Sequence, residues 1–261
     1  MKVTGERVVS RAGGFNPAWQ RHSAAYVLCE PYLGPGRVLD LGCGVGHSFD
    51  RLAPREIVGV DIDPKAIEGQ DRDTVVADMR ELPFDDASFS SVVAIHSIEH
   101  VPDPERVVAE AARVLERNGV AVFVTPNRLT FGRPDEIIDP YHYVEFAPSE
   151  LRAVCEQGFE DVQVRGLFSS DRYLELFTEE RTTLARLLRL DPLRLRRLVP
   201  RKIRQSLYDG LLRHYRPAGD PRAEAIGPDD FELRSAGLEE SFDLYAFCRR
   251  PIGPGRVGSR V

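Results

Sequence analysis

The segment R-V-L-D-L-G-C-G-V-G, residues 37–46, constrains the fold of this chain more than any other stretch. An apolar run ends in Asp40 and passes directly into three glycines with the spacing G-x-G-x-G. A short apolar run is typical of a parallel strand that is buried on both faces. The glycines allow a tight turn and let a ligand approach the backbone closely. The segment therefore predicts the first strand and the ligand loop of a βαβ unit.

The glycine spacing also indicates the chemistry of the ligand. Dinucleotide sites use G-x-G-x-x-G, which brings the N-terminus of a helix onto a pyrophosphate. Here the third glycine, Gly46, comes one residue earlier, and Asp40 lies where a pyrophosphate would meet a negative charge. An acid at this position suits a ligand that carries an ammonium group.

Three more apolar runs have the length and order of parallel strands. They comprise residues 57–61, 75–79 and 91–95. Because ligands bind outside the carboxyl ends of the strands in open α/β sheets, the ends of all four strands are expected to face one crevice. Asp61 then lies where a carboxylate accepts hydrogen bonds from both hydroxyls of a ribose. The last of these runs leads into H-S-I-E-H-V, residues 96–101.

These motifs resemble those of the class I S-adenosylmethionine-dependent methyltransferases, in particular the methyltransferase type 11 or ubiquinone-biosynthesis-like group. The resemblance covers residues 19–167 well and residues 229–250 weakly. It implies an α/β fold with a Rossmann-like, seven-stranded, mostly parallel sheet whose last strand is antiparallel. It also implies an enzyme that uses S-adenosyl-L-methionine as its cofactor.

The resemblance further implies a set of cofactor-binding residues. Asp61 binds the ribose, Asp78 receives the adenine amino group, and Met79 packs on the adenine ring. The complete implied set is Asp40, Gly42, Cys43, Gly44, Gly46, Asp61, Ile62, Asp78, Met79, His96, Tyr26 and Arg21.

A predicted helix before the first strand carries the contacts to the cofactor carboxylate in this family. Tyr26 matches the family pattern, but Ala25 stands where the family has an arginine. Arg21 or His22 can substitute for that arginine, because both lie about one turn earlier on the same helix. A polar helix face without a ligand is the alternative interpretation.

Two histidines are candidate catalytic residues, since an alcohol acceptor needs a base to take its proton. His96 closes the fourth strand, and His142 follows a long loop after the fifth, so both are expected at the carboxyl edge of the sheet. Imidazole titrates near neutral pH and often serves as a general base. A hydrogen-bonded structural role is the alternative for each. A metal bound by His96 and His100 would need further ligands in a recognisable pattern, so no metal site is predicted.

The remaining pattern predicts one core that is interrupted by an insertion. The core comprises residues 1–167 and 229–250, with helices over 104–116 (capped by Asp103) and 150–157 (capped by Ser149), and strands over 120–125, 162–167 and 243–248. Residues 168–228 carry leucines at helical spacings, and we interpret them as a helical insertion before the last strand that acts as a lid on the acceptor side. Residues 251–261 are interpreted as a flexible tail.

A basic run within the insertion, Arg186 to Arg204, has three interpretations. It forms a solvated helix face, a surface for an acidic partner or a lipid headgroup, or a clamp for a phosphorylated or carboxylated acceptor. Its apolar side is rich in leucine and lacks aromatic anchors, which favours packing onto the domain over membrane binding.

The composition of the 261 residues excludes several classes of protein. A net charge of −6 and a pI near 5.6 argue against a nucleic-acid partner, which needs a basic face. No apolar run approaches the roughly 18 residues of a membrane span, so no membrane insertion is expected. The N-terminus lacks the apolar region of a signal peptide. The four scattered cysteines indicate a reducing compartment, so the expected location is the cytoplasm. The oligomeric state is not predicted.

The sequence favours methyl transfer to a small-molecule acceptor, first of all to an oxygen of a sugar, a phenol or another secondary metabolite. One alternative is a methyltransferase that acts on tRNA or protein, which is expected to carry a basic surface or a recognition domain. A second alternative is a non-catalytic cofactor-binding protein, which the complete motif set disfavours. The N-P-P-Y or D-P-P-Y signature of amino-group methylation is absent after the fourth strand, where H-S-I-E stands.

Overall fold

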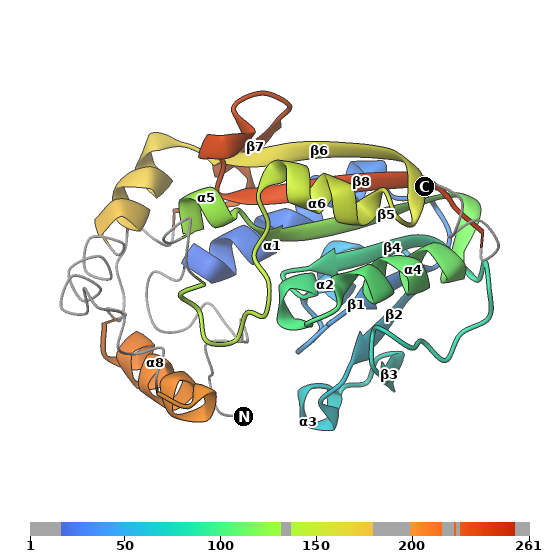
Figure 1. Cartoon of the computed structure of the whole chain (residues 1–261), viewed down its shortest axis with the longest axis horizontal. Coiled ribbons are helices and arrows are strands. Elements are labelled where there is room, and N and C mark those ends of the chain that lie inside the picture. The colour runs from blue at the N-terminus through green and yellow to red at the C-terminus, as the bar shows by residue number, and fades with distance from the viewer. Residues whose placement is uncertain (1–16, 132–136, 180–198, 216–221, 223–224, 254–261) are drawn as a thin grey trace. The chain divides into compact units, whose positions relative to one another are not determined.

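The structure is a computed structural model and describes residues 17–131, 137–179, 199–215, 222 and 225–253 (Figure 1). The chain forms two compact units, which are described separately. The larger unit comprises Ala25–Ile137, His142–Phe168 and Leu233–Val261, and the smaller comprises Met1–Ala24, Ile138–Tyr141 and Ser169–Glu232.

The strands and helices alternate through the first half of the chain. The strands are β1 (Val38–Leu41), β2 (Ile57–Asp61), β3 (Thr74–Val76), β4 (Phe89–Ile95), β5 (Leu115–Pro126), β6 (Phe159–Ser169), β7 (Phe231–Arg234) and β8 (Asp243–Pro251). The helices are α1 (Pro17–Cys29), α2 (His47–Arg51), α3 (Pro64–Ile67), α4 (Pro104–Val114), α5 (Arg128–Phe131), α6 (Pro148–Cys155) and α8 (Arg201–Tyr215), with short 3-10 turns η1 (Glu30–Tyr32), η2 (Ile98–His100), η4 (Pro228–Asp230) and η5 (Leu238–Glu240).

The strands form one sheet with the order β3-β2-β1-β4-β5-β8-β6-β7. Strands β1 to β5 pair in parallel, whereas β8 runs antiparallel to both β5 and β6. The predicted mostly parallel sheet with an antiparallel last strand is therefore confirmed. The strand count of seven is wrong, because the described chain has eight strands. The additional strand, β7, lies at the sheet edge, and its four residues carry no apolar run that would mark a strand in the sequence.

The core of the larger unit lies between the sheet and the helices that cover it. All residues of β1 and β4 are buried, as expected for strands covered on both faces. Helix α4 directs Val107, Val108 and Ala111 into this core, and α6 adds Leu151. Figure 1 shows α4 and α6 on the same face of the sheet, and α6 packs on β8. This packing fixes the strand ends that carry the candidate site.

The boundary between α4 and β5 differs from the sequence prediction. The helix ends at Val114, two residues before the predicted Glu116, and the strand begins at Leu115 instead of Val120. Leu115 pairs with Phe89 of β4 and is buried, so sheet pairing overrides its helical propensity. Asp103 is the N-cap residue as predicted, but its side chain makes no capping bond and binds Arg80 instead.

Two further boundaries shift. Helix α6 begins at Pro148, so its N-cap is Ala147 and not the predicted Ser149. The carboxylate of Glu150 accepts a hydrogen bond of 2.7 Å from the N–H of Ala147 and thereby satisfies the helix start from within the first turn. The third strand ends at Val76, which leaves Asp78 and Met79 in the following loop.

The smaller unit contains most of the predicted insertion. Residues 171–179 and α8 are helical, as predicted, while residues 180–198 lie outside the described residues. The guanidinium of Arg172 holds Asp230 by two hydrogen bonds, and the ring of Tyr173 packs edge-on against Phe231 at 4.7 Å. Of the basic run, Arg201, Lys202 and Arg204 are described, and Arg201 donates hydrogen bonds to the carbonyls of Pro140 and Tyr141.

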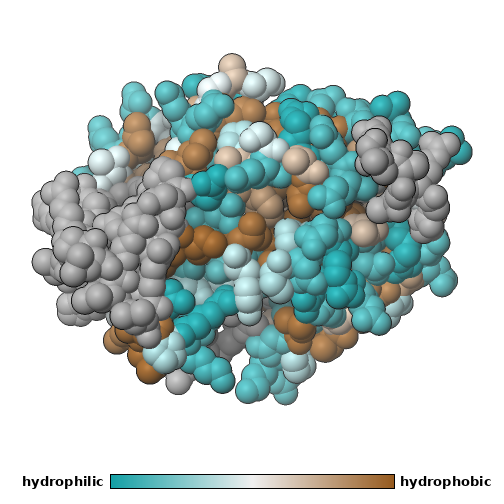
Figure 2. All heavy atoms as spheres, in the orientation of Figure 1, coloured by the Kyte–Doolittle hydropathy of each residue, from teal (hydrophilic) through white to brown (hydrophobic). Residues whose placement is uncertain are grey.

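The surface shown in Figure 2 is mainly hydrophilic, with apolar residues in small groups. None of the helices in the described ranges is both long enough and apolar enough to cross a membrane. The large apolar side chains that are exposed among the described residues are Val27, Ile62, Val76, Tyr143, Leu174, Ile203 and Leu207.

Candidate functional site

The glycine-rich loop after β1 has three left-handed glycines, with φ values of 76° at Gly42, 52° at Gly44 and 80° at Gly46. A Cβ on Gly42 would lie 2.6 Å from Cβ of Ser97, and one on Gly46 would lie 2.7 Å from Oε1 of Gln70. A Cβ on Gly44 would meet nothing within 4 Å. Close packing against Ser97 thus requires the glycine at position 42, whereas the atoms nearest Gly46 are the ends of two flexible side chains, and Gly44 faces open space that a ligand can occupy.

The loop is held in place by three side chains from the β2 and β3 region. Oδ2 of Asp61 accepts a hydrogen bond of 3.0 Å from the N–H of Gly44. Nε2 of Gln70 donates a hydrogen bond of 3.1 Å to the carbonyl of Gly44. A guanidinium nitrogen of Arg72 binds the carbonyl of Gly46. The predicted ribose residue Asp61 therefore also orders the loop, and Gln70 and Arg72 are supports that the sequence analysis missed.

Two exposed apolar side chains lie beside Asp61 at the edge of the sheet. Ile62 is 65% exposed and Val76 is 53% exposed. Asp61 of β2 pairs with Val76 of β3, so the side chain of Val76 lies at the same edge of the sheet as Asp61 and the adjacent Ile62. An exposed apolar surface next to a carboxylate suits the flat ring and the hydroxyls of a nucleoside. Val76 was not among the predicted residues.

Asp40 and Tyr26 form a buried pair beneath the loop. The hydroxyl of Tyr26 lies 3.2 Å and 3.1 Å from the two carboxylate oxygens of Asp40, and both residues are fully buried. Burial raises the pKa of Asp40 from 3.8 to about 6, although the hydroxyls of Ser48 and Tyr26 act in the opposite direction. The carboxylate of Asp40 therefore has no exposed surface, and its role toward a ligand remains a prediction.

We expect the stability of the chain to depend on Asp40 between pH 4 and pH 6. A pKa raised from 3.8 to about 6 means that the folded state binds the proton more tightly, so the stabilisation is present below pH 4 and is lost as the pH rises through 6. This pKa difference of about 2 corresponds to about 3 kcal/mol in the free energy of unfolding. As the pH rises from 4 to 6, the free energy of unfolding of Asp40→Asn should therefore increase by about 3 kcal/mol relative to that of the wild type. Urea unfolding at several pH values measures this difference, and parallel pH curves would contradict it.

The predicted adenine residues lie in the loop after β3. Asp78 binds the guanidinium of Arg80, with Oδ2 at 2.6 Å from Nη2, and this pair lowers the pKa of Asp78. Arg80 also binds Asp103 at 2.7 Å and so fixes the loop to the start of α4. Cε of Met79 lies 3.6 Å from the position that a Cβ on Gly42 would take. Met79 therefore adjoins the glycine-rich loop.

His96 follows β4 with a φ of 49°, an uncommon conformation for a residue other than glycine. Its Nε2 lies 3.4 Å from Asp243, the first residue of β8, and its Nδ1 lies 3.7 Å from Glu99. Burial disfavours the charged ring, but the two buried carboxylates outweigh this effect and raise the pKa of His96 to about 9. His96 is therefore an imidazolium at neutral pH.

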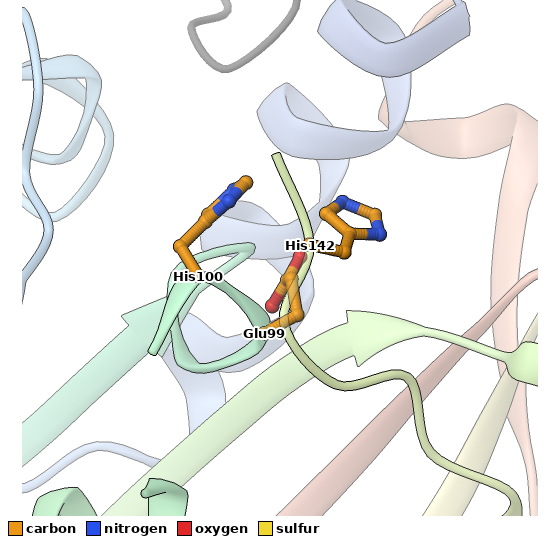
Figure 3. A group of neighbouring side chains, drawn as sticks. All are labelled: Glu99, His100 and His142. Atoms are coloured by element: carbon orange, nitrogen blue, oxygen red, sulfur yellow. The ribbon is translucent and has the colours of Figure 1, made fainter. Parts of the chain in front are cut away.

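His142 lies on the loop that precedes α6, and Nδ1 of its ring is 2.8 Å from Oε1 of the buried Glu145. The loop is attached to η2, because the N–H groups of Tyr143 and Val144 donate to the carbonyl of Glu99. The rings of His100 and His142 are 5.1 Å apart. Figure 3 shows the carboxylate of Glu99 between the two rings.

Two predicted site residues have other surroundings. The side chain of Cys43 packs into the core beside Ala66 and Ile67, and burial raises the pKa of its thiol. Arg21 belongs to the smaller unit, where its guanidinium lies 5.5 Å from the ring centre of Phe177. Both remain predictions as cofactor residues.

Several residues of the site were not predicted. Asp243 and Glu145 orient the two candidate histidines, and Glu99 and His100 adjoin His142. The only local signal for the last pair is that the dipeptide E-H follows directly after a strand end in the segment H-S-I-E-H-V. Asp243 lies at the start of the last strand, and only the antiparallel pairing of β5 with β8 brings it to this edge.

Comparison with known proteins shows what this chain is similar to. A family described as a methyltransferase domain matches residues 39–123. The chain is 31% identical over 265 residues to a "probable S-adenosylmethionine-dependent methyltransferase" of Mycobacterium tuberculosis, with 96% of this chain and 90% of the relative covered. A shorter match, 40% identical over 103 residues, links 34% of the chain to 38% of a 27-O-demethylrifamycin SV methyltransferase of Amycolatopsis mediterranei.

The fold is also similar to that of a solved structure. An S-adenosylmethionine-dependent methyltransferase of Thermotoga maritima, described as a "possible histamine N-methyltransferase", aligns with a TM-score of 0.58. The alignment covers 89% of this chain and 91% of that chain at 17% sequence identity, so it shows a shared fold.

Proposed function

Because the chain belongs to the S-adenosylmethionine-dependent methyltransferases, we propose that it transfers the methyl group to an oxygen of a small-molecule acceptor. The acceptor is a sugar, a phenol or another secondary metabolite. The observation that carries this proposal is the pair of His142 and Glu145, which provides a base for a hydroxyl group. The partial match to an enzyme named for methylation of an oxygen of a rifamycin supports the same class of acceptor.

The residues of the larger unit fit the cofactor of this family. The open space at Gly44 leaves room for a ligand against the backbone, and Asp61 lies beside it with the exposed Ile62. Asp61 holds the ribose, Ile62 and Met79 pack on the adenine, and Asp78 receives the adenine amino group. For the other residues of the cofactor-binding set that the family resemblance implies, we keep the same proposal.

The chemistry of the transfer requires little covalent work from the protein. S-adenosyl-L-methionine supplies a methyl group on a positively charged sulfur. The acceptor oxygen forms a bond to the methyl carbon while the carbon–sulfur bond breaks and its electron pair stays on the sulfur. The chain contributes the orientation of the two reactants, the exclusion of water and the removal of the acceptor proton.

Of the two predicted catalytic histidines, His142 is the better base. A carboxylate on Nδ1 holds the proton on that nitrogen and leaves Nε2 to accept the proton of the acceptor. His96 already carries a proton at neutral pH, because two carboxylates stabilise its charge. His96 therefore serves to position η2 and β8, and its charge lies at the carboxyl edge of the sheet.

A matched pair of glycine variants tests the cofactor loop. Gly44→Ala places a methyl group into open space at a φ of 52°, so it costs about 1–2 kcal/mol of stability yet blocks the ligand, with an expected loss of S-adenosylmethionine affinity of at least about 10-fold. Gly42→Ala adds a clash with Ser97 and costs about 1–3 kcal/mol more. Titration calorimetry and urea unfolding measure both quantities. If Gly44→Ala bound S-adenosylmethionine with wild-type affinity, the glycine-rich loop would not be part of the cofactor site.

The insertion, residues 168–228, serves acceptor recognition. The expected result of deleting it and joining its ends with a short glycine-serine linker is a chain that still binds S-adenosylmethionine and no longer transfers the methyl group. Calorimetry and a transfer assay separate the two effects. Full activity of the shortened chain would contradict this role.

The alternative acceptor class is tRNA or protein. The net charge of −6 disfavours it, because a nucleic-acid surface requires a basic face. The proposed location is the cytoplasm, and the proposed partner is the small-molecule acceptor alone.

A transfer experiment tests the proposal. The chain is incubated with S-adenosylmethionine labelled on the methyl group and with separate pools of hydroxylated small molecules, tRNA and unfolded protein. Label in the small-molecule pool supports the proposal when NMR of the purified product places the labelled methyl group on an oxygen, and a methyl group on nitrogen or carbon would contradict it. Label in tRNA or protein would establish the alternative, and the absence of label from every pool, with cofactor binding intact, would contradict the proposed acceptor.

A further inference from the structure

Three side chains of the larger unit form a cluster that the sequence did not predict as a group. Glu99 and His100 belong to η2, and His142 comes from the loop that precedes α6. One donor atom from each of the three residues lies within 4.8 Å of the others. Figure 3 shows the carboxylate facing the two imidazole rings from two separate segments of the chain.

We infer that Glu99, His100 and His142 bind a divalent transition-metal ion of the Zn²⁺ class. Two imidazoles and one carboxylate are a donor set that Zn²⁺ and its first-row neighbours accept and that Mg²⁺ or Ca²⁺, which prefer oxygen ligands, do not. Bonds of about 2.0–2.2 Å place the donors of a tetrahedral ion roughly 3.4 Å apart. The cluster therefore closes around an ion with side-chain movements on the order of 1 Å.

The support around His142 is the second observation. Oε1 of Glu145 is 2.8 Å from Nδ1 of His142, and the side chain of Glu145 is buried. A metal-binding histidine usually carries a carboxylate on its other nitrogen, which fixes the orientation of the ring and strengthens the ligand. Nε2 of His142 is then the ligand atom, and it acts as the base of the proposed reaction only while no ion is bound.

The carboxylate of Glu99 is the third observation. Glu99 is 1% exposed, and its Oε2 is buried without a hydrogen-bond partner among the described residues. A buried carboxylate oxygen without a partner costs free energy, and a metal ion would satisfy it. The other oxygen lies on the side of His96, 3.7 Å from Nδ1. Glu99 is thus held on one oxygen and presents the other to a ligand.

The backbone fixes the two segments to each other. The N–H of Tyr143 donates a hydrogen bond of 2.8 Å to the carbonyl of Glu99, so the ligands of η2 and the loop are joined before any ion binds. A set of three protein ligands leaves at least one coordination position for water or substrate. An ion here would lower the pKa of a bound acceptor hydroxyl, a consequence that rests on the proposed function, whereas metal binding itself does not.

The test uses the full chain, freed of metal with a chelator, and Zn²⁺ as the probe in titration calorimetry. One equivalent is expected to bind to the wild type. His100→Gln and His142→Gln should each weaken binding by at least about 100-fold, and Glu145→Gln by roughly 10- to 100-fold. His47→Gln on α2 is the matched control for the loss of a histidine and should bind like the wild type. Circular dichroism without metal checks that each variant is folded.

Cobalt provides a spectroscopic readout that does not depend on activity. Co²⁺ in the wild type should give visible bands of a nitrogen and oxygen site, and these bands should be lost in His142→Gln and kept in His47→Gln. Excess Mg²⁺ should not displace the Co²⁺. Wild-type Zn²⁺ affinity in both ligand variants, less than one equivalent bound to the wild type, or thiolate bands in the Co²⁺ spectrum would each overturn the assignment.

Discussion

His142→Ala is expected to lower the turnover of methyl transfer by roughly 10²- to 10⁴-fold, while the affinity for S-adenosylmethionine stays unchanged. The physical reason is the loss of the nitrogen that accepts the acceptor proton. The residual rate should rise with pH, because the acceptor then ionises without help. Steady-state kinetics in the presence of a chelator isolate the role of the base from that of a metal ion.

The variant Glu145→Gln provides the matched comparison for this prediction. It keeps the shape of the side chain next to Nδ1 of His142 and removes the negative charge. Turnover should fall less than in His142→Ala, because the ring is still present but is less well oriented. If properly folded His142→Ala turned over at the wild-type rate, a histidine base would be excluded, and positioning of the reactants would have to carry the reaction.

His96→Asn is expected to lower the free energy of unfolding by about 3–5 kcal/mol, because removal of one partner leaves buried charges without compensation. The two carboxylates, Asp243 and Glu99, are almost completely buried. Asparagine is chosen because it accepts the left-handed backbone conformation at this position better than most residues. Urea unfolding at neutral pH measures the loss.

A double variant distinguishes the charge effect from a packing effect. Adding Asp243→Asn to His96→Asn removes one of the two carboxylates that lost their partner, so part of the stability should return. If adding Asp243→Asn to His96→Asn lowers the free energy of unfolding as much as Asp243→Asn does in the wild type, the two residues do not interact.

The glycine-rich loop shows which features of the site the sequence alone can predict. The apolar run of β1, the acid at its end and the G-x-G-x-G spacing are local properties, and they predicted the strand, the turn and the ligand class. Asp61 was also predicted, since an acid at the end of a second buried strand must reach the same sheet edge. These residues follow from pattern because their geometry depends on neighbours within one βαβ unit.

Helix propensity alone predicted the wrong boundary between α4 and β5, where strand pairing competes with helix formation. Leu115 was predicted as helical and is a strand residue, because its pairing with Phe89 buries it in the sheet. The eighth strand was missed, since four residues at a sheet edge do not need a continuous apolar run. Such elements gain their stability from the rest of the sheet and not from their own sequence.

Only the tertiary structure decided the chemistry of the histidines. The sequence placed His96 and His142 at the carboxyl edge of the sheet, but the charge of His96 comes from Asp243 and Glu99, and the orientation of His142 comes from Glu145. Asp243 reaches the site because β8 pairs antiparallel with β5, an interaction between segments that lie far apart in the chain. Electrostatic effects depend on distance in space and on burial, so a sequence pattern names the titratable groups and the fold sets their protonation.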